Sequence, residues 1–252
     1  MNSQQVCAYL GVSRPTIHRW EHGRNAPNIG NVRALAQAYD ASPAELSRMT
    51  SLAEQGNVKG IWEGAKVPYE LRALYESESS AHMIRTVELD YIPGLLQTPE
   101  YMVEAQKVAS PRTDDENREI RETFARRQAV MFTGETSGPT MKFVFGQSAL
   151  LYLREHPEVY DAQVARLREM SRWSNVEIRV LTRLHPAMTG AFTIIDADPD
   201  GIVAPFAFLE ALDGCRYVET PDVVSQYDQT WEQVWDVAIP LEEYLNDTWK
   251  VA

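Results

Sequence analysis

Residues 10–27 read LGVSRPTIHRWEHGRNAP, and this stretch decides the fold of the N-terminal part of the chain. The helical pattern of Gln4–Leu10 ends at Gly11, a residue that tolerates the positive φ at which many helices terminate. Ser13 then supplies a side-chain oxygen suited to cap the next helix, and the proline two residues later fits its first turn. Helix, glycine turn and capped helix are the layout of a helix-turn-helix, with Ser13–His22 as the second helix.

The residues after this stretch continue in helical spacing. Val32, Leu35, Ala36 and Tyr39 stand at i, i+3, i+4 and i+7, which predicts one inward-facing stripe. Further along, Ser42-Pro43-Ala44-Glu45 is a capping-box pattern that opens another helix. We therefore expect an all-α domain over residues 1–52, with Ile17 and Trp20 of the second helix also facing its core.

Two parts of this region resemble a known family. Residues 10–27, with Trp20-Glu21-x-Gly23-Arg24 inside them, and the later Leu35-Ala36-x-x-Tyr39 are similar to the Cro/cI-type, xenobiotic-response-element family of DNA-binding domains. The resemblance implies double-stranded DNA as the partner and Ser13–His22 as the recognition helix. The base-edge contacts that it implies belong to Arg14, His18 and Arg19. The phosphate contacts that it implies belong to Asn2, Ser3, Thr16, Arg24 and Asn25.

One departure from the family bears on DNA binding. The family normally has a further helix before the position of Asn2, and the sequence lacks this usual first helix. We therefore expect the faces of Val6, Ile17 and Leu35 to be partly uncovered. This expectation keeps open the alternative of a protein-interaction module whose helix-turn-helix no longer grips DNA.

Charge is distributed unevenly along the 252 residues. The whole chain carries 24 basic and 36 acidic side chains, a formal net charge of −12. Residues 1–50 hold five arginines against three acidic residues, or +2, which leaves −14 for the remainder. Such asymmetry points to a nucleic-acid-facing segment joined to an acidic regulatory part.

The composition excludes several classes of protein. A chain with 44% hydrophobic and 24% charged residues is globular rather than disordered or fibrous. No apolar run reaches the roughly 18 to 20 residues that a membrane helix needs, and no secretory signal opens the sequence. The two cysteines, Cys7 and Cys215, cannot build a disulfide framework. These observations predict a cytoplasmic protein without a membrane partner.

The sequence beyond a Gly-punctuated linker at 53–66 alternates strands and helices. This alternation predicts an α/β domain with a mixed sheet over residues 67–252, and hence an α+β or α/β chain overall. The expected strands are 83–89, 142–145, 176–181, 191–195 and 206–211, with a turn at 198–201. The expected helices are 69–81, one starting after Thr98, one from the Thr113 cap to about Met131, 148–153, 157–173, 221–235 and 241–249.

Residues 92–101 read IPGLLQTPEY, a turn followed by a capped helix. The string resembles the signature of an uncharacterised domain that follows a Cro/cI-type helix-turn-helix in actinobacterial regulators. The candidate ligand or partner residues around it are Tyr91, Gly94, Gln97, Thr98 and Tyr101. The helix start can bind an anion through its N–H groups, or the turn can be purely structural, and the sequence leaves both open.

No catalytic pattern stands out in this part of the chain. The sequence has no phosphate loop, HExxH, GxSxG or CxxC, so we expect no catalytic residues, no metal and no cofactor. The strand–helix order is similar to that of phospholipase-D-like folds, but His185 lacks the lysine two residues later that this chemistry needs. A nucleotide- or small-molecule-binding domain of that type, without catalysis, is the less favoured alternative.

The prediction from the sequence is a transcriptional regulator, not an enzyme. Its N-terminal domain reads DNA, and its C-terminal domain senses an effector molecule or binds a small protein, which in the family is often encoded by a neighbouring gene. We expect a homodimer, both from the family and because two half-sites raise the affinity for DNA.

Overall fold

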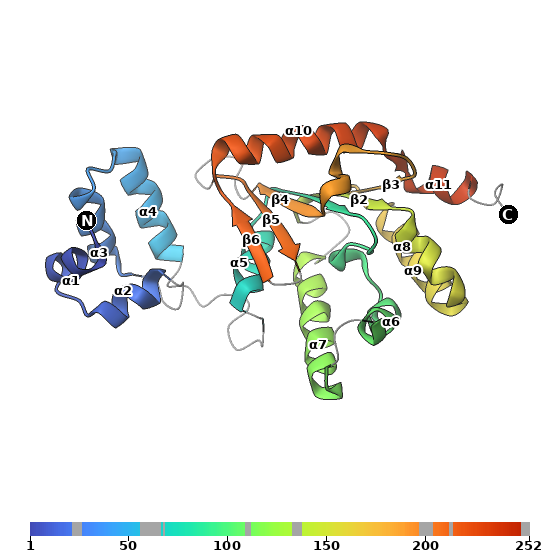
Figure 1. The fold of residues 1–252 in the computed structure, drawn as a ribbon, viewed down its shortest axis with the longest axis horizontal. Helices are drawn as coiled ribbons and strands as arrows, with labels where there is room; N and C mark the ends of the chain where they lie inside the picture. The colour runs from blue at the N-terminus through green and yellow to red at the C-terminus, as the bar shows by residue number, and fades with distance from the viewer. Residues whose placement is uncertain are drawn as a thin grey trace. The chain divides into compact units, whose positions relative to one another are not determined.

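The structure is a computed structural model that describes residues 1–21, 27–55, 67, 69–108, 112–132, 138–196, 204–211 and 214–247. The chain divides into two compact units, Met1–Glu63 and Gly64–Ala252 (Figure 1). Each unit is built around its own elements.

Four helices make up the described part of the N-terminal unit: α1 (Ser3–Leu10), α2 (Arg14–Glu21), α3 (Ile29–Ala38) and α4 (Pro43–Gln55). Gly11 ends α1 with φ 69°, as its sequence predicts, and its N–H donates to the carbonyl of Cys7. The carbonyl of Ser13 accepts the first hydrogen bonds of α2, from the N–H groups of Thr16 and Ile17. At α4, the predicted capping box between Ser42 and Glu45 is confirmed.

The core of this unit corrects two expectations. Val6 and Ile17 were expected to be partly uncovered, but only 7% and 4% of their surface is exposed, because α1 packs against both α2 and α3. Leu35 is half-buried. The expectation that Tyr39 faces inward is wrong. Tyr39 is 51% exposed, because α3 ends at Ala38 and the chain turns away there.

In the described part of the C-terminal unit, one mixed sheet has seven strands in the order β6-β5-β4-β1-β2-β3-β7. β1, β2 and β3 run parallel, and the other neighbours are antiparallel. The register places Val87 beside Val144 and Phe143 beside Ile178. The strands are β1 (Met83–Glu88), β2 (Thr140–Gly146), β3 (Val176–Leu181), β4 (Phe192–Asp196), β5 (Phe206–Ala211), β6 (Gly214–Val218) and β7 (Ile239–Pro240).

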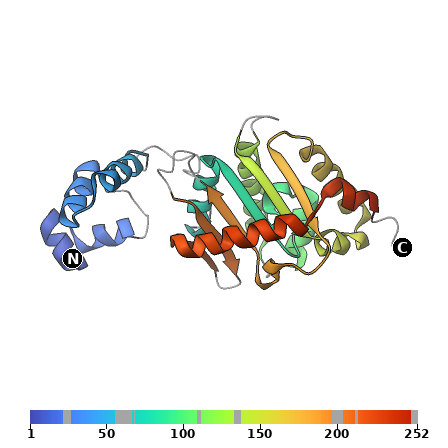
Figure 2. The same ribbon diagram turned by 90° about the horizontal axis from the view of Figure 1, so that it is seen from above.

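Helices cover both faces of this sheet. Figures 1 and 2 show α10 (Pro221–Val237) crossing one face, while α5 to α9 lie on the other. The remaining helical elements are α5 (Tyr69–Ser79), η1 (Gly94–Leu96), α6 (Pro99–Val108), α7 (Asp114–Met131), α8 (Ser148–Leu151), η2 (Tyr152–Glu155), α9 (Pro157–Met170), η3 (Pro186–Thr189) and α11 (Leu241–Asp247).

Alternation along the strands divides the core into two layers. Under α10, Val87, Val144 and Ile194 of the sheet pack against Trp231 and Val234 of the helix, all 2% exposed or less. Residues of the opposite parity face the other helices. An arginine on the α10 face, Arg85, is neutralised there by Asp196 at 3.0 Å and Asp228 at 2.7 Å. The sheet therefore has no solvent-facing side over its central strands.

The predicted fold class is confirmed: a helical helix-turn-helix region precedes a domain with a mixed sheet. The strands expected at 176–181 and 206–211 are found at those bounds, and the helix expected after Thr113 ends at Met131. Strands β6 and β7 were not predicted, and the turn expected at 198–201 lies outside the described residues. Among the helices that the structure describes, none is long and apolar enough to cross a membrane.

Candidate nucleic-acid interface

The second helix of the N-terminal unit, α2, presents its basic side chains to solvent along one arc. At 100° per residue, Arg14, His18 and Arg19 span about 140° of the helix surface. All three are exposed, whereas Ile17 and Trp20, on the opposite side, are buried and half-buried. The same helix that packs into the core through Ile17 thus exposes two arginines and a histidine to solvent.

Thr16 joins this arc through side-chain hydrogen bonds. Its hydroxyl lies 2.9 Å from the hydroxyl of Ser13, and it accepts a hydrogen bond of 3.4 Å from the Nη2 of Arg19. The contact draws the guanidinium of Arg19 along the helix towards its N-terminus. Because the guanidinium keeps other N–H donors, this bond does not use up its capacity for a bidentate contact.

Asn2 and Ser3 lie at the start of α1. Asn2 caps this helix: its side chain accepts from the N–H of Gln5 at 3.0 Å, and its own N–H donates to the Gln5 side chain at 2.9 Å. Ser3 is the first helical residue and is half-buried. Of the other phosphate-contact candidates, Arg24 and Asn25 lie outside the described residues.

In the C-terminal unit, the IPGLLQTPEY segment forms η1 and the start of α6 at the end of β1. A Cβ built on Gly94 would lie 3.0 Å from both Arg127 Nη1 and Phe124 Cε1 of α7. Arg127 makes a two-pronged ion pair with Glu78 of α5, at 2.8 and 2.5 Å. Burial by itself would lower the pKa of Arg127, but the facing Glu78 and Tyr75 outweigh it, so the pKa is raised. The glycine makes room for this buried arginine.

The polar groups of the same segment are bonded inward. The Gln97 side chain donates to the carbonyl of Ile92 at 2.7 Å, and the N–H of Ile92 donates to the hydroxyl of Tyr101 at 3.1 Å. Thr98 caps α6 by accepting from the N–H of Tyr101. Burial raises the pKa of Tyr101 to about 12, so its hydroxyl stays neutral and fixed in this network. Tyr91 differs from the rest, because 48% of its surface is exposed.

These two regions match separate family models. Residues 71–244 match a family described as a domain of unknown function, DUF5753, which spans well over half of the chain. The chain belongs to this family. Residues 1–46 match a helix-turn-helix family, so the DUF5753 domain is preceded by a helix-turn-helix, a fold that places its second helix in the DNA major groove.

Comparison with whole proteins adds little to these two matches. No curated protein matches the chain. Among solved structures, the chain is similar to TrmBL2, an archaeal chromatin protein whose structure is described as showing a novel mode of DNA binding. The likeness has 13% identity and a TM-score of 0.31, over 88% of this chain and 67% of that one. At this TM-score the likeness carries no argument about fold or function.

Three residues that hold the segment 92–101 in place were missed from the sequence: Arg127, Gln128 and Gln163. The Gln128 amide donates to the carbonyls of Gly94, Leu95 and Gln97, at 3.4, 3.1 and 2.7 Å. The fully buried Gln163 of α9 accepts from the N–H of Thr98 at 2.9 Å and donates to the carbonyl of Leu96 at 2.8 Å. For Gln163 the sequence did hold a signal: this polar residue lies on the same inward stripe of α9 as Leu167 and Met170, which indicates a buried hydrogen-bonding role.

Glu88, the last residue of β1, lies on the same side of the sheet as the signature. It is half-buried, and desolvation together with the repulsion of Glu210 on β5 raises its pKa to about 7, against the opposing effect of Arg127. Among the described residues, no group of three histidine, cysteine or acidic side chains lies close enough to hold a metal ion. The polar groups beside residues 92–101 are therefore a half-buried carboxyl group and the ion pair of Arg127 with Glu78.

Proposed function

We propose that this chain is a sequence-specific DNA-binding transcriptional regulator whose α2 is the recognition helix. The observation that carries the proposal is the exposed arc of Arg14, His18 and Arg19 on the second helix of a matched helix-turn-helix. Arginine is the side chain best suited to the N7 and O6 atoms of guanine, and the arc is wide enough to lie in a major groove. The helix-turn-helix match supports DNA as the partner.

Phosphate contacts complete the proposed interface. Asn2 and Ser3 stand at the N-terminus of α1, where helix N–H groups favour an anion, and Thr16 stands beside Arg19. Arg24 and Asn25, just past α2 in the sequence, are proposed for the same role on the family resemblance. We further propose a homodimer in the cytoplasm, since one helix-turn-helix reads only a half-site.

The DUF5753 domain is proposed to carry regulation by a small-molecule effector or a small protein partner, without catalysis. The signature at 92–101 supports the actinobacterial type of regulator. Within the signature region, we place contact with a partner on the exposed Tyr91. Gly94, Gln97, Thr98 and Tyr101 are instead proposed to position the turn, because their contacts are directed inward.

A protein-interaction module is the second candidate function, and one observation favours it. Tyr91 and Tyr152 are 48% and 64% exposed, the hydroxyl of Tyr152 donates to the exposed Asp90 at 3.5 Å, and Tyr91 follows Asp90 in the sequence. Exposed aromatic side chains of this kind suit a protein interface.

Selection of DNA from a random duplex library by the full chain separates the two candidates. A DNA reader enriches one sequence motif, and its affinity for the enriched duplex falls steeply with salt, because phosphate contacts release counterions. If the chain enriches no motif although circular dichroism shows that it is folded, the proposed function is overturned and the protein-interaction module remains.

A further inference from the structure

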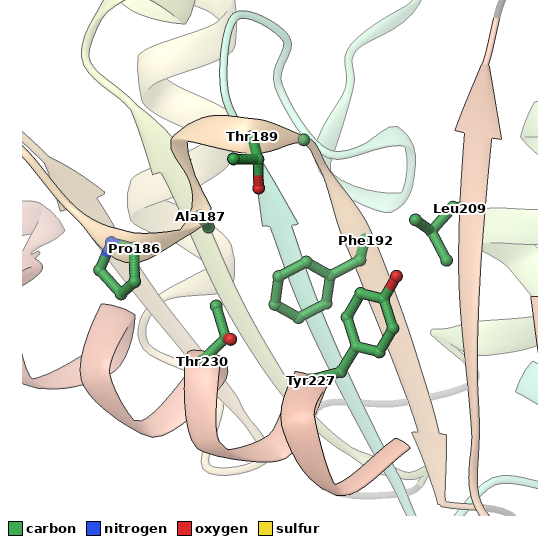
Figure 3. Close-up of a pocket in the computed structure, with 8 residues that line it drawn as sticks. Pro186, Ala187, Thr189, Phe192, Leu209, Tyr227 and Thr230 are labelled. Atoms are coloured by element: carbon green, nitrogen blue, oxygen red, sulfur yellow. The ribbon is translucent and has the colours of Figure 1, made fainter. Parts of the chain in front are cut away.

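A small pocket opens on the α10 side of the sheet, away from the signature. It has a volume of about 190 Å³ and lies between η3, β4, β5 and α10 (Figure 3). The figure shows the Phe192 and Tyr227 rings facing the same space, with Thr230 on the helix below and Thr189 above. Its other lining residues are Pro186, Ala187, Gly190 and Leu209.

The walls of this pocket are held by contacts of their own. The rings of Phe192 and Tyr227 meet edge to face at 5.2 Å, and the Tyr227 hydroxyl accepts a hydrogen bond of 3.2 Å from Arg216. Phe192 and Ala187 are 5% and 2% exposed, while Thr189 is exposed. The pocket therefore runs from an exposed rim to a buried, apolar floor at Phe192 and Ala187.

The lining carries no charge. Its polar groups are the hydroxyls of Thr189, Tyr227 and Thr230, and the Thr230 hydroxyl already donates to the Gln226 carbonyl at 2.8 Å. That hydroxyl can still accept a hydrogen bond from a ligand. Two ionic groups lie next to the lining: Arg216 donates to the Tyr227 hydroxyl at 3.2 Å, and Asp228 of α10 pairs with Arg85 at 2.7 Å. A charged group buried against Phe192 and Ala187 would lose its hydration, and none of the lining side chains carries a charge to replace it.

The volume limits the ligand to one ring or a compact fused pair of rings. An apolar cavity of roughly 150 Å³ is known to accept benzene. Two aromatic side chains on one wall favour a flat ring, which can meet them edge to face or offset-stacked. A hydroxyl or N–H on that ring would find acceptors at Thr230 and at the Thr189 rim.

We propose that this pocket is the effector site of the DUF5753 domain and binds a neutral, single-ring or fused-ring molecule with one hydrogen-bond donor. The proposal rests on the ligand-sensing part of the proposed function and names the class of ligand. It places that ligand on the α10 face of the sheet rather than at residues 91–101.

Gly190 offers a direct way to fill the pocket. A Cβ at Gly190 meets no atom within 4 Å, and its φ of 162° is extended backbone that any residue adopts. Gly190 stands two residues before Phe192, so in extended backbone a side chain there points to the same face of the sheet as Phe192. Gly190→Leu should occupy the ring site while leaving the fold intact.

The test uses phenol and indole as neutral ring probes, with benzoate and benzylamine as charged rings of similar size. Binding to the full chain is measured by isothermal titration calorimetry and by ligand-observed NMR. We expect phenol or indole to bind with at least about tenfold higher affinity than either charged ring, because burial penalises the charge. Gly190→Leu should weaken that binding at least about tenfold, the loss expected when a ligand's space is filled.

Met188→Ala is the matched control. Met188 belongs to the same η3 segment, but its side chain is 58% exposed and does not line the pocket. The Met188→Ala variant should bind phenol and indole with the same affinity as the unchanged chain. If Gly190→Leu fails to fold, Leu209→Phe replaces it, since this change also fills the pocket from a half-buried position.

Three results would overturn the proposal: no saturable binding up to about 10 mM, where a ligand of this size with ordinary efficiency binds; equal binding of benzoate or benzylamine; or full binding by the folded variant whose pocket is filled. Affinity for the selected duplex is measured separately, without ring probes. Ring binding without DNA selection would refute the proposed function alone, and DNA selection without ring binding would refute this pocket alone.

Discussion

At the scale of single residues, Gly94 shows how a missing side chain organises its surroundings. Gly94→Ala would place a Cβ 3.0 Å from Arg127 and Phe124, and Arg127 is held in place by Glu78 and by the Tyr75 ring at 4.5 Å. We expect a loss of about 1–3 kcal/mol in the free energy of unfolding, as in other overpacked sites. Urea denaturation measures it.

Gly190→Ala is the control for this prediction. Its Cβ would meet nothing within 4 Å, so its free energy of unfolding should stay within about 0.5 kcal/mol of the unchanged chain or rise slightly. Equal effects at the two glycines would show that the Arg127 contact does not constrain Gly94.

Glu88 predicts a dependence of stability on pH. The charged and titratable groups around it are Glu210 of β5, Arg127 of α7 and Tyr101 of α6. The folded pKa of about 7 lies above the ordinary value of 4.5, so the folded state binds more protons than the unfolded state between these values. The contribution of Glu88 is therefore fully present below pH 4.5 and is lost as the pH rises through 7.

Glu88→Gln should remove this dependence. Compared with the unchanged chain, the variant should gain stability at pH 8, by about 1 kcal/mol, and differ little at pH 4. Denaturation midpoints at both pH values measure it, with the exposed Glu122→Gln of α7 as a control that should show no such gain. If Glu88→Gln and the unchanged chain show the same difference in stability between pH 4 and pH 8, the raised pKa of Glu88 is contradicted.

At the scale of elements, Gln163 ties α9 to the start of α6. Gln163→Leu would leave the N–H of Thr98 and the carbonyl of Leu96 without partners in the core. Each buried group left unbonded costs about 1–3 kcal/mol, so we expect a loss of at least about 2 kcal/mol in the free energy of unfolding. Thermal and urea unfolding measure it. Gln226→Leu, on the exposed side of α10, should be nearly neutral.

Local signals account for the elements that the sequence predicts well. The Thr113–Glu116 capping box sets the start of α7 at Asp114, and the positive φ of Gly11 sets the end of α1. Strand β6 was missed because only Val218 of its five residues is buried, with Cys215 and Tyr217 half-buried, a pattern too short to separate from a loop. Strand β7 has two residues and exists only through its pairing with Arg179 and Val180.

The candidate sites also differ in whether local sequence or distant contacts determine them. The exposed arc of α2 follows from helical spacing alone, so Arg14, His18 and Arg19 can be placed on it from the sequence. The role of Gly94 depends on Arg127, thirty-three residues later, and no local pattern contains that contact. The ring pocket likewise gathers residues from four elements that adjoin only after the sheet has formed.

At the scale of the whole molecule, charge is separated along the chain. The net charge of −12 combines +2 in residues 1–50 with −14 in the remainder. The excess of acid in the DUF5753 domain discourages that domain from contacting DNA, while the basic arc of α2 remains suited to phosphates and guanine. The overall acidity of the chain therefore does not argue against a DNA-binding regulator.

The central claim is that α2 reads DNA sequence through its arginines. It is tested most directly by the ratio of affinities for the selected duplex and a random duplex, measured by fluorescence anisotropy at one salt concentration. Arg14→Ala with Arg19→Ala should lower this ratio by at least about tenfold, since each base contact contributes about 1–3 kcal/mol of discrimination. Arg72→Ala, which removes an exposed arginine from α5, should leave it unchanged. An unchanged ratio in the double variant, with the fold intact, would contradict the claim.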